Sequence, residues 1–149
     1  MQRRFRVATL LAGAVLATAC GTPGKACFDL AADVNAHFYD GQAHATVVYL
    51  YPLSNAIEFD QTTPQQLLNG YIPGGMEVRE PTKVRILPGE ARELEYEFPE
   101  KTTQVGVVAD LYREQRDREG TRRLSIPATC GAFSTRPSVY VGPTDLQRN

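Results

Sequence analysis

The chain has 149 residues, 42% of them hydrophobic, which suits one domain with a sizeable core. Its formal net charge is −1, and a mildly acidic chain is a poor candidate for binding nucleic acid. Neither G-x-S-x-G nor H-E-x-x-H occurs, so we expect no enzyme, no catalytic residue and no cofactor.

The first nineteen residues read as an export signal. Three arginines lie among the first six residues, and the uncharged run Val7–Ala17 follows. This run is too short to span a bilayer as a helix, so it predicts export rather than a membrane anchor. Small residues, Ala17-Thr18-Ala19, then precede Cys20.

A cysteine directly after small residues resembles the lipobox of bacterial lipoproteins, although Ala17 stands where the common lipobox has Leu. The resemblance implies that residues 1–19 are removed and that Cys20 carries lipid and holds the chain to a membrane. Gly21, rather than Asp, after the cysteine implies the outer membrane, with the domain facing the periplasm. The alternative is an ordinary A-x-A cleavage site with Cys20 left as a free thiol.

The remaining cysteines are Cys27 and Cys130. Three cysteines are an awkward number for an exported chain, but a lipid on Cys20 leaves a pair. The periplasm is oxidising, so this pair is expected to form a disulfide, worth about 4–5 kcal/mol for so long a loop. Alternatively, both are small buried apolar residues. Residues 20–26 form a short tether, whose reach of about 20 Å keeps the domain, residues 27–149, close to the membrane.

Most of the domain reads as strands. Residues 28–34 alternate, with Phe28, Leu30, Ala32 and Val34 predicted on the buried face. The segment 35–43 contains Asp40-Gly41 and predicts a loop. Residues 46–51 are apolar, β-branched or aromatic throughout and predict a central strand that Pro52 ends.

One segment predicts a short helix. In residues 63–70, Thr63 is a suitable N-cap, Pro64 suits the first helical position and Gly70 suits the end. We expect Phe59, Leu67 and Leu68 to anchor this region on the sheet.

Strands resume at residues 83–87 and 93–98, separated by the turn signal Pro88-Gly89. If the two strands form a hairpin, a three-residue loop places Val84 opposite Leu94 and allows surface ion pairs. Those pairs join Lys83 to Glu95 and Arg85 to Glu93. A two-residue loop would place Val84 opposite Glu93 and mismatch both faces.

Residues 105–112 predict a central strand buried on most of both faces, and residues 113–123 predict a solvated, charged hairpin tip. Residues 124–127 and 138–141 predict two further short strands. Many short strands with turn signals and one short helix predict an all-β fold, a two-sheet antiparallel β-sandwich.

No metal site is expected. His37 and His44 flank the first loop, but Asp40 is the only further ligand nearby, so these histidines are interpreted as surface residues. Asp29 and Asp33 are interpreted as exposed carboxylates that keep a strand face soluble.

The order of these features resembles the TssJ family, the outer-membrane lipoproteins of the type VI secretion system. The resemblance rests on the lipobox cysteine, the strand with Val47, Tyr49, Tyr51 and Leu53, the turn Leu87–Glu90 and the segment Val105–Glu114. The chain departs from the family in having no Trp, with Arg122 and Arg123 where a Trp-Arg pair is common. The Cys27/Cys130 pair and the tail after Cys130 also differ.

The resemblance implies a transthyretin-like sandwich with an added helix. It implies a structural role, anchoring the trans-envelope complex by binding the periplasmic C-terminal part of TssM, an inner-membrane protein. The family's main contact is the first loop, here Asn35–Ala45, with the partner-binding candidates His37, Phe38, Tyr39, Asp40 and His44. Two aromatics in a polar loop also suit an interface independently, although they could instead fold back and cap the sandwich.

A second hypothesis is a periplasm-facing lipoprotein sandwich that binds a small ligand or inhibits an envelope enzyme. A pocket with convergent polar groups would favour this hypothesis, and a protruding first loop would favour the secretion role.

Overall fold

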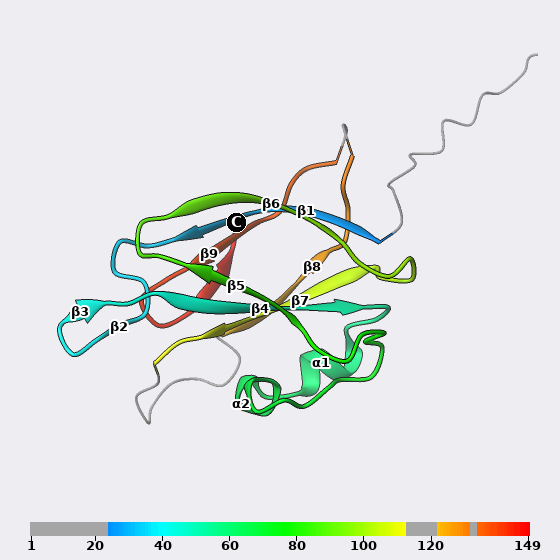
Figure 1. The fold of residues 1–149 in the computed structure, drawn as a ribbon, viewed down its shortest axis with the longest axis horizontal. Coiled ribbons are helices and arrows are strands. Elements are labelled where there is room, and N and C mark those ends of the chain that lie inside the picture. The colour runs from blue at the N-terminus through cyan, green and yellow to red at the C-terminus, as the bar shows by residue number, and fades with distance from the viewer. Residues whose placement is uncertain (1–23, 113–121, 132–133) are drawn as a thin grey trace, which may run out of the picture.

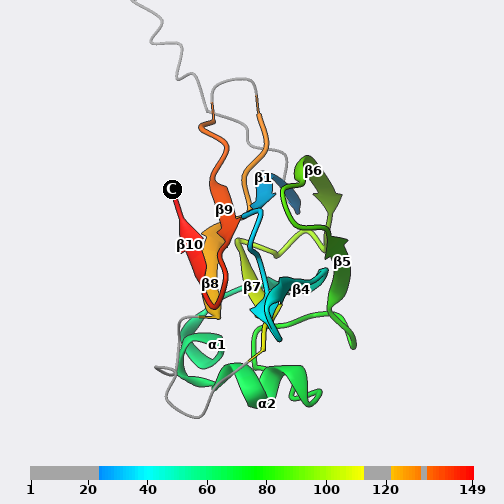
Figure 2. The same ribbon diagram turned by 90° about the vertical axis from the view of Figure 1, so that its left-hand side faces the viewer.

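The computed structural model describes residues 24–112, 122–131 and 134–149. Their strands form two four-stranded sheets packed face to face (Figures 1 and 2). The first sheet has the order β10-β9-β1-β6 and consists of β1 (Lys25–Ala32), β6 (Ala91–Glu97), β9 (Ser138–Val141) and β10 (Leu146–Arg148). The second has the order β5-β4-β7-β8 and consists of β4 (Thr46–Leu53), β5 (Thr82–Ile86), β7 (Gln104–Asp110) and β8 (Arg123–Pro127).

The expected β-sandwich is confirmed, with one feature the sequence did not indicate. β1 pairs with β9 in parallel, whereas its pairing with β6 is antiparallel. The chain leaves β8 in the second sheet at the end of the sandwich where β1 begins, and therefore enters β9 in the same direction as β1. The strand β10, three residues long, then closes the edge of the first sheet.

The core lies between the sheets and follows the predicted alternation. Phe28 and Leu30 of β1 face Val48 of β4 and Val107 of β7, and all four are fully buried. The prediction for Val34 is wrong, because this side chain is 70% exposed. β1 ends at Ala32, and the turn that follows leaves Val34 on the surface.

The outer face of the second sheet is covered by two helices, α1 (Ile57–Gln61) and α2 (Pro64–Leu68). Phe59 and Leu67 are buried against this face, and Leu68 packs beside them, as expected. Thr63 and Gln66 form a reciprocal capping box at the start of α2. The helix α1 was not expected: it is one turn long and has no side-chain N-cap hydrogen bond.

β7 is therefore buried on both faces from Val105 to Ala109, as predicted for the first part of residues 105–112, and β4 is buried on both faces from Leu50 to Leu53. β4 continues through Pro52 to Leu53, so the expected stop at Pro52 is wrong. β5 pairs with β4 only from Thr46 to Leu50. On that side Pro52 therefore has no partner in β5, and its missing N–H is tolerated.

The expected hairpin between residues 83–87 and 93–98 is wrong. β5 pairs with β4, whereas β6 pairs with β1, so the turn between them crosses from one sheet to the other. Val84 lies opposite Val48, and Leu94 lies opposite Phe28. Both side chains still face the core, because the inner faces of two stacked sheets impose the same alternation as a hairpin.

The expected ion pairs of that hairpin are absent from the described residues. Glu95 instead lies 3.6 Å from Lys25, and Glu93 lies 2.7 Å from Arg136. The predicted charged tip falls mostly on residues 113–121, outside the described residues, and β8 begins at Arg123.

Candidate partner-binding site

The segment 35–45, expected to be a loop, contains a small hairpin of β2 (Phe38–Tyr39) and β3 (Gln42–Ala43). Asp40 and Gly41 connect the strands with φ angles of 50° and 77°. Two consecutive residues with positive φ suit a type I′ turn, for which Asp-Gly is a preferred sequence. The hairpin protrudes from one end of the sandwich (Figure 1). We call it the β2–β3 hairpin.

One side of the β2–β3 hairpin is an aromatic stack. The ring of Tyr39 lies 3.7 Å from that of His44 and 4.9 Å from that of Tyr112, which follows β7. His44 Nε2 donates to the carbonyl oxygen of Tyr39 at 3.3 Å, and His37 Nδ1 donates to that of Ala45 at 3.1 Å. Tyr39 and the two histidines therefore stabilise the hairpin itself.

Phe38 differs from its neighbour Tyr39, since its side chain is 42% exposed. Exposed apolar side chains also lie at three other segments of this end of the sandwich. Val34 follows β1, Leu87 follows β5 and Tyr112 follows β7. Phe38 thus suits an interface anchor, whereas Tyr39 packs within the structure.

Asp33 fixes the base of the hairpin. Its carboxylate accepts hydrogen bonds from the Tyr140 hydroxyl and, at 2.7 Å, from the Asn35 N–H. These hydrogen bonds, that of Tyr140 foremost, lower the pKa of Asp33. The carbonyl oxygen of Asp33 also accepts from the N–H groups of Ala36 and Gly89, which ties the hairpin to the turn between β5 and β6.

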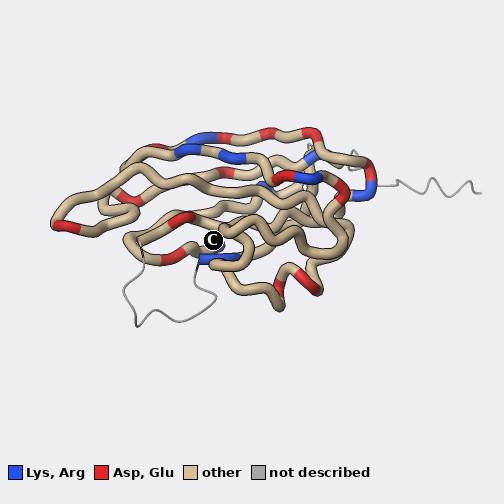
Figure 3. Tube along the Cα trace, turned by 60° about the horizontal axis from the view of Figure 1, so that its bottom comes forward, with Lys and Arg blue, Asp and Glu red and all other residues tan. Residues whose placement is uncertain are grey.

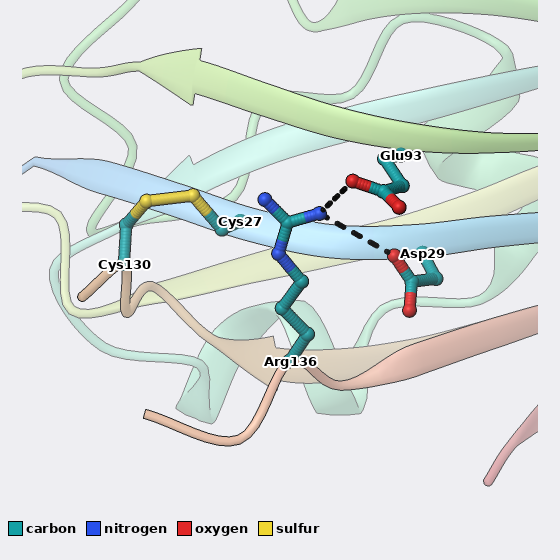
Figure 4. A network of polar contacts seen from close by, with 5 residues as sticks. All are labelled: Cys27, Asp29, Glu93, Cys130 and Arg136. Carbon is teal, nitrogen blue, oxygen red and sulfur yellow. Dashed lines mark hydrogen bonds and ion pairs between the residues drawn. A yellow bond between two sulfur atoms is a disulfide. The ribbon is translucent and has the colours of Figure 1, made fainter. Parts of the chain in front are cut away.

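The opposite end of the sandwich holds the start of β1 and the cysteine pair. Cys27 and Cys130 lie side by side, with Cα atoms 4.9 Å apart and their sulfur atoms joined (Figure 4). The Cys27 N–H donates to the carbonyl oxygen of Thr129 at 3.0 Å. Thr129 and Cys130 belong to the segment that carries the chain from β8 to β9, so the pair ties this crossing to β1. Cys20 lies outside the described residues.

A charged cluster lies beside the cysteine pair on the outer face of the first sheet. Arg136 reaches between Glu93 and Asp29, with its Nη1 atom 2.7 Å and 3.7 Å from their carboxylates (Figure 4). Glu95 and the two cysteines are close enough to form a metal site, but a disulfide has no thiolate to offer as a ligand.

Comparison with known proteins identifies the family. The family described as type VI secretion lipoprotein, VasD, EvfM and TssJ matches residues 27–139. The chain belongs to this family. The members of this family are described as lipoproteins of type VI secretion. No curated protein matches the chain. Within the described residues, no helix is long and apolar enough to cross a membrane.

Solved structures share the fold. The lipoprotein TssJ1 from Pseudomonas aeruginosa is 23% identical, with a TM-score of 0.69 and coverage of 85% of this chain and 95% of that one. Lip from Serratia marcescens, a membrane-bound component of the type VI secretion system, is 17% identical, with a TM-score of 0.68 and coverage of 85% and 96%. A chain in a structure of the TssM C-terminal domain from EAEC is 19% identical, with a TM-score of 0.69 and coverage of 84% and 97%.

Two features of the end of the sandwich that carries the β2–β3 hairpin were not predicted from the sequence. Asp40-Gly41 is a turn signal, but the flanking strands are too short to show alternation. The contact between Tyr39 and Tyr112 joins residues far apart in the sequence, and no local pattern indicates it.

Proposed function

We propose that this type VI secretion lipoprotein is held in the outer membrane by lipid on Cys20. There it anchors the trans-envelope complex by binding the periplasmic part of a TssM-like inner-membrane protein through the β2–β3 hairpin. Family membership and the likeness to a chain found in a TssM structure support the choice of partner.

The observation that carries the proposal is the position of the hairpin. β1 begins at Lys25, near the start of the described part of the chain, and ends at Ala32 next to the base of the hairpin. The start of β1 and the hairpin therefore lie at opposite ends of the sandwich (Figure 1). A domain held at the membrane by its N-terminus then presents the hairpin toward the periplasm, where a partner can reach it.

The hairpin also offers suitable chemistry. Phe38 is apolar and partly wet in the free protein, and Val34 and Leu87 are further exposed apolar side chains at this end of the sandwich. Burying a large apolar side chain contributes about 1.5–3 kcal/mol before the costs of association are subtracted. Hot spots of interfaces are often buried aromatic side chains surrounded by a less important rim.

Binding of the purified periplasmic domain of TssM to the Phe38→Ala variant tests the proposal. We expect the affinity to fall at least about tenfold, or about 1.4 kcal/mol. The melting temperature should stay nearly constant, because Phe38 lies outside the core. Ile57→Ala is the matched control, since Ile57 is an exposed apolar residue on α1.

If wild type and Phe38→Ala bound the TssM domain with equal affinity, Phe38 would not be part of the interface. A large fall in melting temperature would show instead that Phe38 caps the sandwich. Tyr39→Ala is a poor substitute, because it would also break the stack with His44 and Tyr112.

A further inference from the structure

A pocket of about 360 Å³ lies on the outer face of the second sheet, beside α2 and away from the β2–β3 hairpin. This volume is within the range of natural ligand pockets. Aromatic and aliphatic side chains form much of its lining, including Tyr49, Leu68 and Ile72. Arg79 and Lys83 contribute positive charge to the same lining.

The pocket wall formed by residues 70–72, together with the turn that follows it, is held in place by α1. The carboxylate of Glu58 accepts hydrogen bonds from the Tyr71 hydroxyl and, at 2.8 Å, from the Gly74 N–H. A Cβ at Gly74 would come 2.3 Å from Glu58 Oε2, so a larger residue there would have to displace the end of the Glu58 side chain. On the opposite side, the Tyr51 hydroxyl donates to the Leu67 carbonyl oxygen at 3.0 Å. The pocket is thus formed before any ligand arrives, which lowers the entropic cost of binding.

The charge around the pocket favours a carboxylate. Arg79, Lys83 and Arg85 form no ion pair with another described residue. Lys83 Nζ lies 5.5 Å from the ring centroid of Tyr49, which places its charge over an aromatic wall. Glu80 is the one acidic residue that lines the pocket among the described residues. A local excess of positive charge stands out in a chain of net charge −1.

The surroundings of the pocket favour a protein over a small molecule. Tyr71 and Ile72 are exposed on its rim and would stay wet around a small ligand. On its other side runs β5, the edge strand of its sheet. Lys83 also lines a shallow groove between β5 and β6 with Arg85 and Arg92, and Figure 3 shows Lys and Arg positions side by side on this edge. An extended protein segment could cover both the rim and this basic edge.

We propose that this pocket is a second docking site, which takes a segment of a partner protein with an aromatic or aliphatic side chain beside a carboxylate. The apolar side chain enters between Tyr49 and Leu68, and the carboxylate pairs with Arg79 and Lys83. The site is independent of the β2–β3 hairpin and of the partner proposed for it.

Amide NMR spectra of the mature chain carrying Cys20→Ser, which removes only the lipid site, provide the test. The probe is the blocked tripeptide acetyl-Glu-Phe-Glu-amide. Its uncharged partner is acetyl-Gln-Phe-Gln-amide, and acetyl-Glu-Gly-Glu-amide lacks the apolar side chain. We expect the first peptide to shift amides in residues 67–72 and 79–83, and the other two to bind at least about fivefold more weakly.

The double variant Arg79→Gln with Lys83→Gln should weaken binding of acetyl-Glu-Phe-Glu-amide at least about fivefold. The matched control Lys101→Gln removes an exposed lysine elsewhere and should leave binding unchanged. Phe38→Ala should also leave it unchanged, which separates this site from the hairpin. Unchanged melting temperatures would show that the variants remain folded.

Three outcomes would overturn the proposal. The first is no shift of the pocket amides up to about 10 mM peptide, the weakest range of specific binding. The second is equal binding of the three peptides. The third is binding of free N-acetyl-phenylalanine as tightly as the tripeptide, which would make the pocket a small-ligand site.

Discussion

Gly106 of β7 lies directly beneath the ring of Phe59 of α1. A Cβ built at Gly106 would come 2.5 Å from two ring atoms of Phe59. The glycine therefore leaves the space into which α1 docks. Arg123 of β8 also contacts α1. Its guanidinium lies 5.9 Å from the Phe59 ring centroid, and it donates a hydrogen bond to the carbonyl oxygen of Thr62 at the end of the helix.

Gly106→Ala should lower the free energy of unfolding by about 1–3 kcal/mol, because the added methyl group displaces Phe59 from a packed site. Urea denaturation measures the change. Gly131→Ala is the control, since a Cβ there meets no atom closer than 3.8 Å. A stability equal to that of wild type would show that α1 shifts without cost.

Cys20 should carry lipid, because the small residues before it resemble a lipobox. Cells fed labelled palmitate should label the wild-type protein and leave Cys20→Ser unlabelled. In a separate fractionation, Gly21→Asp should move the protein from the outer to the inner membrane. Equal palmitate labelling of wild type and Cys20→Ser would contradict lipidation at this residue.

Cys27 and Cys130 should be bonded in the exported protein, since the fold places them side by side. Alkylation of the denatured Cys20→Ser protein without reductant should find no free thiol. The double variant Cys27→Ala with Cys130→Ala should lose about 2–5 kcal/mol of stability, as for native disulfides in small secreted domains. Two alkylated thiols per chain would refute the bond.

The hydrogen bond from Tyr140 to Asp33 should make stability depend on pH. It lowers the pKa of Asp33 in the folded state, so its contribution is present above the unfolded value near 3.8 and is lost as pH falls through the folded pKa. In Tyr140→Phe the pKa of Asp33 should rise, as a carboxyl-carbon NMR titration would show. The stability difference between Tyr140→Phe and wild type should shrink on acidification.

The same bond raises the pKa of Tyr140 in the folded protein. Its contribution is therefore present below about pH 10 and is lost as pH rises through the folded pKa. Tyr112→Phe is the control, because its ring stacks on Tyr39 and its hydroxyl is not among the groups that lower the pKa of Asp33. An unchanged Asp33 titration in Tyr140→Phe would show that the hydroxyl does not govern this carboxylate.

The faces of the strands were predictable from the sequence, but the partners of the strands were not. The alternation of Phe28, Leu30 and Ala32 defines a buried face with no knowledge of the other strands. Val84 and Leu94 show the same alternation, yet it is satisfied equally by a hairpin and by two stacked sheets. The register of β5 against β4 depends on contacts distant in the sequence, which local patterns do not encode.

The candidate site was predictable in position but not in detail. The segment 35–45 and its aromatic pair could be selected from the sequence and the family resemblance. The different environments of Phe38 and Tyr39 could not, because Tyr39 packs against Tyr112, which approaches from the end of β7. The basic edge beside the pocket was not predictable either, because the sequence favours ion pairs of Lys83 and Arg85 within a hairpin.

The placement of β1 has a mechanical consequence. Tension between a lipid at Cys20 and a partner on the β2–β3 hairpin enters β1 at Lys25 and leaves it at Ala32. The force then runs along the strand, across its perpendicular hydrogen bonds with β6 and its slanted ones with β9, and loads them together in shear instead of peeling them one by one. The cross-link at Cys27 passes part of this load to the segment between β8 and β9 near the point where it enters. Under the proposed function, this arrangement lets the domain transmit a pull between the membrane and a partner without unravelling from its N-terminus.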